Sequence, residues 1–144
     1  MTVLHLGVVD LPHPGGEKSG LTTGDLAEIL EGKYGLYSSF VEDEAEMIAG
    51  AVTESLGDAV DNILAGLTPS ANPFAAAEQE VRQQFINFLD TRQIESLGIP
   101  GVPTQAALDG VNHRRGKVGH GPRRPSFIDT GTLRIATAAW VDPD

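Results

Sequence analysis

The longest periodic stretch of this chain is residues 38–67, SSFVEDEAEMIAGAVTESLGDAVDNILAGL. Its apolar residues recur at steps of three and four, as on one face of an α-helix; they are Val41, Ala45, Ile48, Val52, Leu56, Ala59, Ile63 and Leu67. The pattern predicts one long amphipathic helix that is acidic on its other face. Gly50 and Gly57 are its expected weak points, because a helical glycine costs about 1 kcal/mol relative to alanine.

A second helix is predicted immediately after this stretch. Asn72 is a favoured N-cap residue, and Pro73 suits the first helical position. The apolar stripe of this helix is rich in phenylalanine and consists of Phe74, Ala77, Val81, Phe85, Phe88 and Leu89. Such a stripe can be a partner-binding face, but core packing against the long helix, as an antiparallel pair, is the favoured interpretation.

The ends of the chain indicate strands around this helical middle. Residues 3–9 are almost all apolar, and residues 132–141 alternate with a period of two. Between them, Thr22 and Asp25 resemble a capping box that opens a short helix over about 23–33, and Thr104 can cap another that ends near residue 111. Two strands alone are marginal, so they are expected to pair with each other, with a third strand or with a neighbouring subunit.

We therefore predict an α+β fold over residues 1–144, taken as a single structural domain. It has a helical middle with a long amphipathic helix pair, and an N-terminal and a C-terminal strand that form a small sheet with extended loops. The chain has no cysteine, which excludes disulfides and thiolate chemistry. It also lacks an apolar run of roughly 20 residues, so no membrane partner is expected.

Charge is distributed unevenly along the chain. Residues 1–110 carry 17 acidic and 4 basic residues, whereas residues 111–144 carry 6 basic and 3 acidic ones. Five of the basic side chains fall within eleven residues, in a loop over about 112–124 that is predicted to be mobile; they are Arg114, Arg115, Lys117, Arg123 and Arg124. Such a loop suits either an acidic protein surface or nucleic acid. No aromatic residues are interleaved to stack on bases, so an acidic protein surface is at least as well favoured.

No catalytic motif emerges. The glycine-rich residues 15–20 have Glu17 where a phosphate-binding loop needs glycine before Lys18. Asp129, Thr130 and Gly131 also occur in aspartic proteases, but that site needs a β-rich fold and a second aspartate. The acidic cluster at residues 42–46 suits a helix start better than a metal site. We expect a protein that is not an enzyme and has no metal or cofactor.

Residues 123–131, RRPSFIDTG, precede Leu133 and the predicted terminal strand. This arrangement resembles tail-completion and head–tail joining proteins of tailed bacteriophages, as do residues 6–10 and 22–30. The resemblance implies a ring-forming virion component, assembled in the host cytoplasm. Its implied partners are copies of itself, the portal or adaptor, the tail terminator or tail tube proteins, and packaged DNA.

The alternatives are a tail terminator, a minor tail protein, or a nucleic-acid-binding accessory protein that uses the basic loop. The candidate interface residues are Arg114, Arg115, Lys117, Arg123, Arg124, Phe127, Asp129, Thr130, Gly131 and Trp140.

Overall fold

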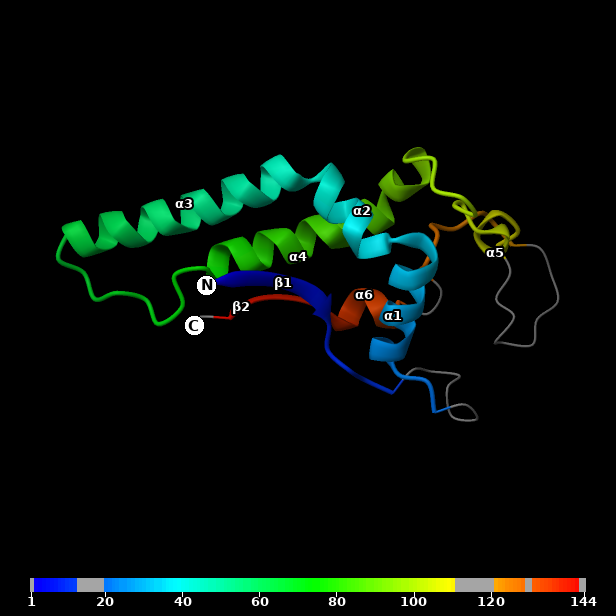
Figure 1. Ribbon diagram of the computed structural model, residues 1–144, viewed down its shortest axis with the longest axis horizontal. Coiled ribbons are helices and arrows are strands. Elements are labelled where there is room, and N and C mark those ends of the chain that lie inside the picture. The colour runs from blue at the N-terminus through cyan, green and yellow to red at the C-terminus, as the bar shows by residue number, and fades with distance from the viewer. Residues whose placement is uncertain (1, 13–19, 111–120, 129–130, 143–144) are drawn as a thin grey trace.

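Helices form most of the computed structural model, which describes residues 2–12, 20–110, 121–128 and 131–142. Figure 1 shows a helical body beside a small sheet built from the two ends of the chain. In chain order the elements are β1 (Val3–Val8), α1 (Thr23–Tyr34), α2 (Leu36–Asp43), α3 (Ala45–Leu64), α4 (Ala75–Asp90), the 3₁₀ helix η1 (Gln93–Ser96), α5 (Gln105–Leu108), α6 (Thr132–Ala136) and β2 (Thr137–Asp142). The predicted α+β class is confirmed. Among the described residues, no helix has the length and apolar character needed to cross a membrane.

The sheet consists of β1 and β2, which run antiparallel from the pair Val3–Asp142 to the pair Val8–Thr137. Of the three pairings considered, the two terminal strands therefore pair with each other. Alternate residues of β1 pack against the core; these are Leu4, Leu6 and Val8. The face that they form lies toward the helices, so the sheet closes one side of the hydrophobic core.

Helices α3 and α4 form the predicted antiparallel pair (Figure 1). The prediction of one helix over residues 38–67 is wrong, however, because the chain breaks at Glu44, where φ is −106° and ψ is 18°. Neither Gly50 nor Gly57 interrupts α3. The break lets α2 bury its own Phe40 against α4, at 5.1 Å from the ring of Phe85, while α3 continues along α4 in another direction.

Helix α4 supplies the centre of the core. Its predicted stripe is buried except for the half-buried Phe74, and Phe85 and Phe88 are fully enclosed. The helix begins at Ala75 rather than Pro73, so the predicted cap was placed too early. Asn72 still acts just before the helix, since its side-chain oxygen accepts a hydrogen bond from the Phe74 N–H at 2.9 Å.

The other predicted helix starts are confirmed. The Thr22 hydroxyl accepts a hydrogen bond from the Asp25 N–H at 3.3 Å, and the Asp25 carboxylate accepts one from the Thr22 N–H at 3.0 Å. Gly35 then ends α1 in the left-handed conformation, at φ 59°, which glycine adopts without strain. Thr104 caps α5, which ends at Leu108 rather than near residue 111.

The predicted strand over residues 132–141 is only partly correct. Its first five residues form α6, and the strand begins at Thr137. The physical reason is the spacing of the buried side chains, since Leu133, Ala136 and Thr137 lie three and four residues apart on one helical face. Ile135, which a strand would have turned inward with Leu133, is 71 % exposed.

Candidate functional site

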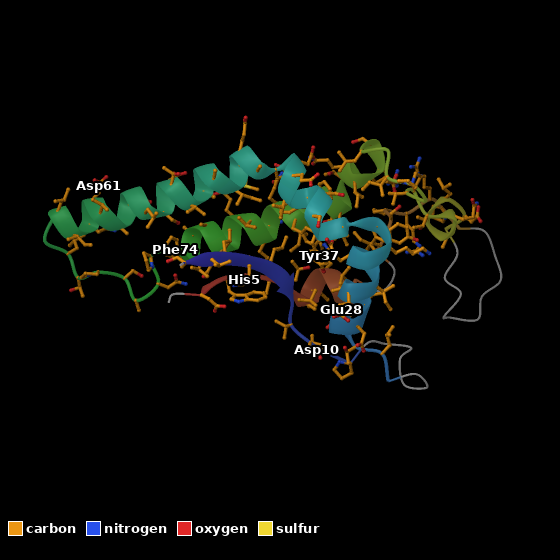
Figure 2. The ribbon with its side chains drawn as sticks, in the orientation of Figure 1. His5, Asp10, Glu28, Tyr37, Asp61 and Phe74 are labelled. Carbon is orange, nitrogen blue, oxygen red and sulfur yellow. The ribbon has the colours of Figure 1, made fainter. Side chains whose placement is uncertain are left out.

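Helix α3 extends past the start of α4. The hydroxyl of Ser55 accepts a hydrogen bond from the Ala77 N–H at 3.0 Å, which fixes the middle of α3 beside the first turn of α4. Residues 56–64 therefore run on for about 14 Å at 1.5 Å per residue. We call residues 56–67 the α3 arm. Figure 2 places Asp61 on this arm, beyond Phe74 at the start of α4.

The α3 arm exposes most of its large apolar side chains. The exposed fractions are 42 % for Leu56, 53 % for Val60, 54 % for Ile63, 79 % for Leu64 and 58 % for Leu67. Leu56, Ile63 and Leu67 belong to the apolar stripe predicted for residues 38–67, but this half of the stripe is exposed. The physical reason is that α4 begins only at Ala75, so no described part of the chain packs over this half of the stripe. Exposed acidic side chains, Glu54, Asp58 and Asp61, accompany it.

The basic segment is only partly described. Arg114, Arg115, Lys117, Asp129 and Thr130 lie outside the described residues. The remaining five predicted interface residues are described and fall in two places. Arg123, Arg124, Phe127 and Gly131 belong to the segment that leads into α6, whereas Trp140 lies on β2.

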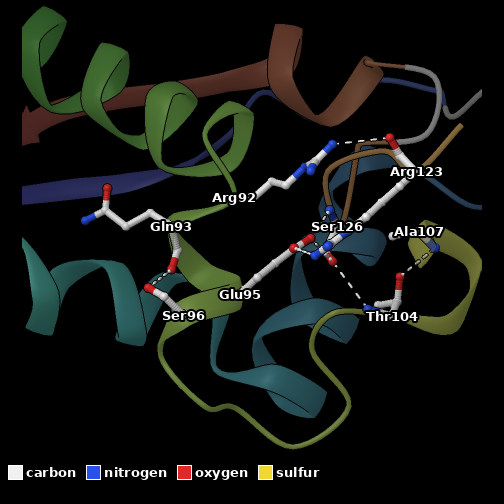
Figure 3. A network of polar contacts seen from close by, with 8 residues as sticks. All are labelled: Arg92, Gln93, Glu95, Ser96, Thr104, Ala107, Arg123 and Ser126. Carbon is white, nitrogen blue, oxygen red and sulfur yellow. Dashed lines mark hydrogen bonds and ion pairs between the residues drawn. The ribbon is translucent and has the colours of Figure 1, made fainter.

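Glu95 of η1 holds residues 123–126 against the body of the protein (Figure 3). Its carboxylate forms an ion pair with Arg123, and only 7 % of the Glu95 side chain is exposed. The same carboxylate accepts hydrogen bonds from the Ser126 N–H at 3.2 Å and the Ser126 hydroxyl at 2.8 Å. The Thr104 N–H donates to the Ser126 hydroxyl oxygen at 3.3 Å, which ties in the start of α5. Residues 123–126 are therefore held in place by hydrogen bonds and an ion pair within the protein.

The electrostatics of Glu95 follow from these contacts. Burial raises the pKa of its carboxyl group, but the hydrogen bonds from Ser126 and Arg123 and the positive charge of Arg123 outweigh burial and leave the pKa lowered. Glu95 is therefore ionised at neutral pH. No sequence signal marks Glu95, because it precedes Ser126 by 31 residues and belongs to no motif.

The neighbours of Arg123 also serve the packing of this segment. The Arg124 N–H donates to the Ala107 carbonyl at 3.1 Å, and its guanidinium donates to the Ile128 carbonyl. Phe127 adopts a left-handed conformation, at φ 68°, and its ring lies 5.0 Å from that of Tyr34. Gly131, at φ 76°, starts α6. These residues shape the turn before α6.

Trp140 lies on the outer face of the sheet. Its ring stacks on His5 with the centroids 5.3 Å apart, and it also covers Gly7, where an added Cβ would come within 3.2 Å of the indole. His5 in turn approaches Asp142, with 3.2 Å between the imidazole nitrogen and the carboxylate oxygen. Trp140 remains 40 % exposed, so this face offers an aromatic surface.

Two residues of the acidic cluster at 42–46, Asp43 and Glu44, accept hydrogen bonds from within the protein. The Gln93 amide donates to both Asp43 and Glu44 at 2.7 Å. Within the described ranges, no three His, Asp or Glu side chains come together in a way that could hold a metal ion.

No known protein family, curated protein or solved structure matches this chain.

Proposed function

We propose that this chain is a non-catalytic assembly protein that acts as a structural component of the head–tail connector of a tailed bacteriophage. It forms a neck or tail-completion ring that joins the portal or adaptor to the tail. The phage assignment rests on the resemblance of residues 123–131 and the chain ends to such proteins. The observation that supports an assembly role is the α3 arm, with its exposed apolar side chains.

An extended apolar surface on a soluble domain marks an interaction site, because leaving it in water costs free energy. The arm presents five large apolar residues along about three helical turns. Acidic residues accompany them, so the fitting partner surface is an apolar groove with lysine or arginine at its rim. A neighbouring virion protein of that kind would cover the arm in the assembled ring.

The described end of the basic segment gives no support to DNA contact. Arg123 keeps 47 % of its side chain exposed, but its charge is matched by Glu95. The Arg124 guanidinium donates to the Ile128 carbonyl. Phosphate binding requires cations whose charge is available to the phosphate, and the charge of Arg123 is already matched by Glu95.

The test uses a phage that encodes this chain. We expect particles that lack the chain to accumulate unjoined heads and tails, and electron microscopy of complemented particles to locate a tagged chain at the head–tail junction. Ile63→Ser on the arm is expected to reduce joining at least tenfold. Ile29→Ser on α1 is the matched control, because Ile29 is 52 % exposed and Ile63 is 54 % exposed.

A tagged chain that is absent from finished particles would overturn the proposed function. Equal joining by the Ile63→Ser and Ile29→Ser variants would remove the arm from it.

A further inference from the structure

The two edges of the sheet differ in how their main-chain groups are satisfied. One residue beyond the last strand pair, the Val9 N–H donates to the Ala136 carbonyl at 2.7 Å. The main-chain N–H and C=O groups of Val9 are therefore directed toward β2. In an antiparallel pair, alternate residues direct their N–H and C=O groups to the same edge. Leu4, Leu6 and Val8 therefore direct theirs away from β2, along the outer edge of β1.

The outer edge of β2 is covered by helix α4. The Val141 N–H donates to the Glu78 carboxylate at 2.9 Å, and the Thr137 carbonyl accepts a hydrogen bond from the Arg82 guanidinium at 2.8 Å. These side chains satisfy main-chain groups that a further strand would otherwise bind. This edge is therefore closed to strand addition.

The outer edge of β1 has no such cover. Among the described residues, no hydrogen bond reaches the outward main-chain groups of Leu4, Leu6 or Val8. The strand reads VLHLGV and contains no Lys, Arg, Asp, Glu or Pro, which are the residues that natural proteins place on an exposed edge to prevent pairing.

We propose that the free protein forms a two-fold dimer in which β1 pairs antiparallel with β1 of a second copy. The axis passes through Leu6, so that Leu6 faces its own equivalent and Leu4 faces Val8 of the other copy. Each of these three pairs exchanges two hydrogen bonds. The product is one four-stranded sheet in which both copies keep their core faces on the same side.

The sequence of β1 favours this register, and it favours a second copy of the chain as the partner. A shift of two residues sets Val8 opposite Thr2, or Leu4 opposite Asp10, and so replaces an apolar pair by a mixed one. Only the register centred on Leu6 matches apolar residues in all three outward pairs. The edge is thus complementary to itself, which is the requirement for an isologous two-fold contact.

This inference goes beyond the proposed function, because it concerns the chain before it joins any partner. The two also respond oppositely to salt. Each copy carries a formal charge of −10, so salt that screens their repulsion strengthens pairing through the uncharged β1 edge. Docking of the acidic α3 arm in a groove with a basic rim weakens under the same conditions. A failure of the proposed dimer is therefore distinguishable from a failure of the proposed function.

The first experiment uses cysteine pairs in a chain that has no cysteine of its own. In the proposed register Val3 faces Val9 of the second copy at a non-hydrogen-bonded position, where Cα atoms lie about 4.5 Å apart and suit a disulfide. Val3 is 36 % exposed and Val9 is 54 % exposed, so both tolerate substitution. We expect a mixture of Val3→Cys and Val9→Cys chains to form disulfide-linked dimers under mild oxidation, as seen by non-reducing gel and intact mass.

Each single variant alone is the control. Its two cysteines would lie about 20 Å apart, given six residues at about 3.3 Å each, and should form dimers at least tenfold more slowly. Equal rates in the mixture and in the single variants would overturn the register.

Sedimentation equilibrium tests pairing without a cross-link. We expect dimerisation at micromolar concentration that tightens with salt, at least a tenfold weakening in Val3→Glu with Val9→Glu, and recovery in Val3→Lys with Val9→Glu. Circular dichroism confirms that each variant is folded. A wild-type chain that stays monomeric at 100 μM protein across the salt range would overturn the proposal.

Discussion

One carboxylate oxygen of Glu95 accepts two hydrogen bonds from Ser126, one from its N–H at 3.2 Å and one from its hydroxyl at 2.8 Å. Ser126 is fully buried, and the other oxygen of Glu95 meets Arg123. A single side chain of η1 therefore fixes the path of a segment that lies about thirty residues further along the chain.

Replacing Glu95 by Gln is expected to lower the free energy of unfolding by about 2 kcal/mol, because hydrogen bonds to a charged group are the stronger ones and the amide cannot serve both partners. Chemical denaturation measures this change. Glu28→Gln is the control: Glu28 is exposed on α1, and its substitution should shift stability by less than about 0.5 kcal/mol. Equal effects of the two variants would contradict the role assigned to Glu95.

Stability at acid pH should depend on the same carboxylate. The pKa of Glu95 is lowered in the folded protein from its ordinary value of 4.5, so its contribution is complete above pH 4.5 and is lost as the pH falls through the folded value. The stability difference between wild type and Glu95→Gln should therefore shrink below pH 4.5. Denaturation curves from pH 7 to pH 3 test this, and a difference that is constant across the range would refute it.

Tyr37 carries a buried hydroxyl that has no hydrogen-bond partner among the described residues. Its ring stacks on Phe85 at 5.1 Å, so Tyr37→Phe keeps the packing and removes the unsatisfied group. We expect the variant to be more stable by about 1 kcal/mol. A loss of stability in thermal or chemical unfolding would show that the hydroxyl has a partner.

Tyr37 is also expected to make the stability of the protein fall at alkaline pH. Burial, together with the charge of Glu31, raises the pKa of Tyr37 from 10.0 to about 12. Because the folded pKa is raised, this contribution to stability is complete below pH 10 and is lost between pH 10 and about 12. The loss should diminish in Tyr37→Phe and persist in the control Tyr34→Phe.

Ser55 supplies a hydrogen bond to the first turn of a different helix. Ser55→Ala leaves the buried Ala77 N–H without its acceptor, and the expected cost is about 1–3 kcal/mol in unfolding free energy. Thr53→Ala is the matched control, because the Thr53 hydroxyl bonds only to the Ala49 carbonyl of its own helix and is exposed. Similar losses from both variants would count against this contact between helices.

The cover on β2 makes a prediction about assembly size. Glu78→Ala with Arg82→Met removes both side chains that bind the β2 edge. With both sheet edges open, chains are expected to add without limit, so light scattering should rise with concentration where wild type stops at a dimer. Val3→Glu with Val9→Glu, added to the same chain, should suppress that growth.

Local signals in the sequence predicted local structure well. The capping pairs at Thr22 and Thr104, the first strand and the stripe of α4 all depend on residues a few positions apart, and each is confirmed. The sequence pattern does not predict the break at Glu44, whose carboxylate accepts hydrogen bonds from the distant Gln84 and Gln93 at 3.3 Å and 2.7 Å. Periodicity along one segment carries no information about such distant partners.

The candidate surfaces also combine features that the sequence indicates with features that depend on distant residues. Ile63 fits a helical stripe whether or not another helix covers it, so only the start of α4 at Ala75 reveals that it is exposed. Arg123 stood out by its charge, but its partner Glu95 carried no signal. Alternation at residues 132–136 predicts a strand, but the two buried residues, Leu133 and Ala136, are three positions apart and share a face only in a helix, which leaves Ile135 exposed.

Because the two ends of the chain pair with each other, β1 must wait for β2 during synthesis. Val8 pairs with Thr137, 129 residues later, so β1 leaves the ribosome long before its partner exists. At 5–20 residues per second the wait lasts about 6 to 26 seconds. During that interval both edges of β1 are open, and neighbouring ribosomes on one messenger RNA hold several such strands close together. The strand that pairs last within its own chain is thus the first that can meet a sister chain.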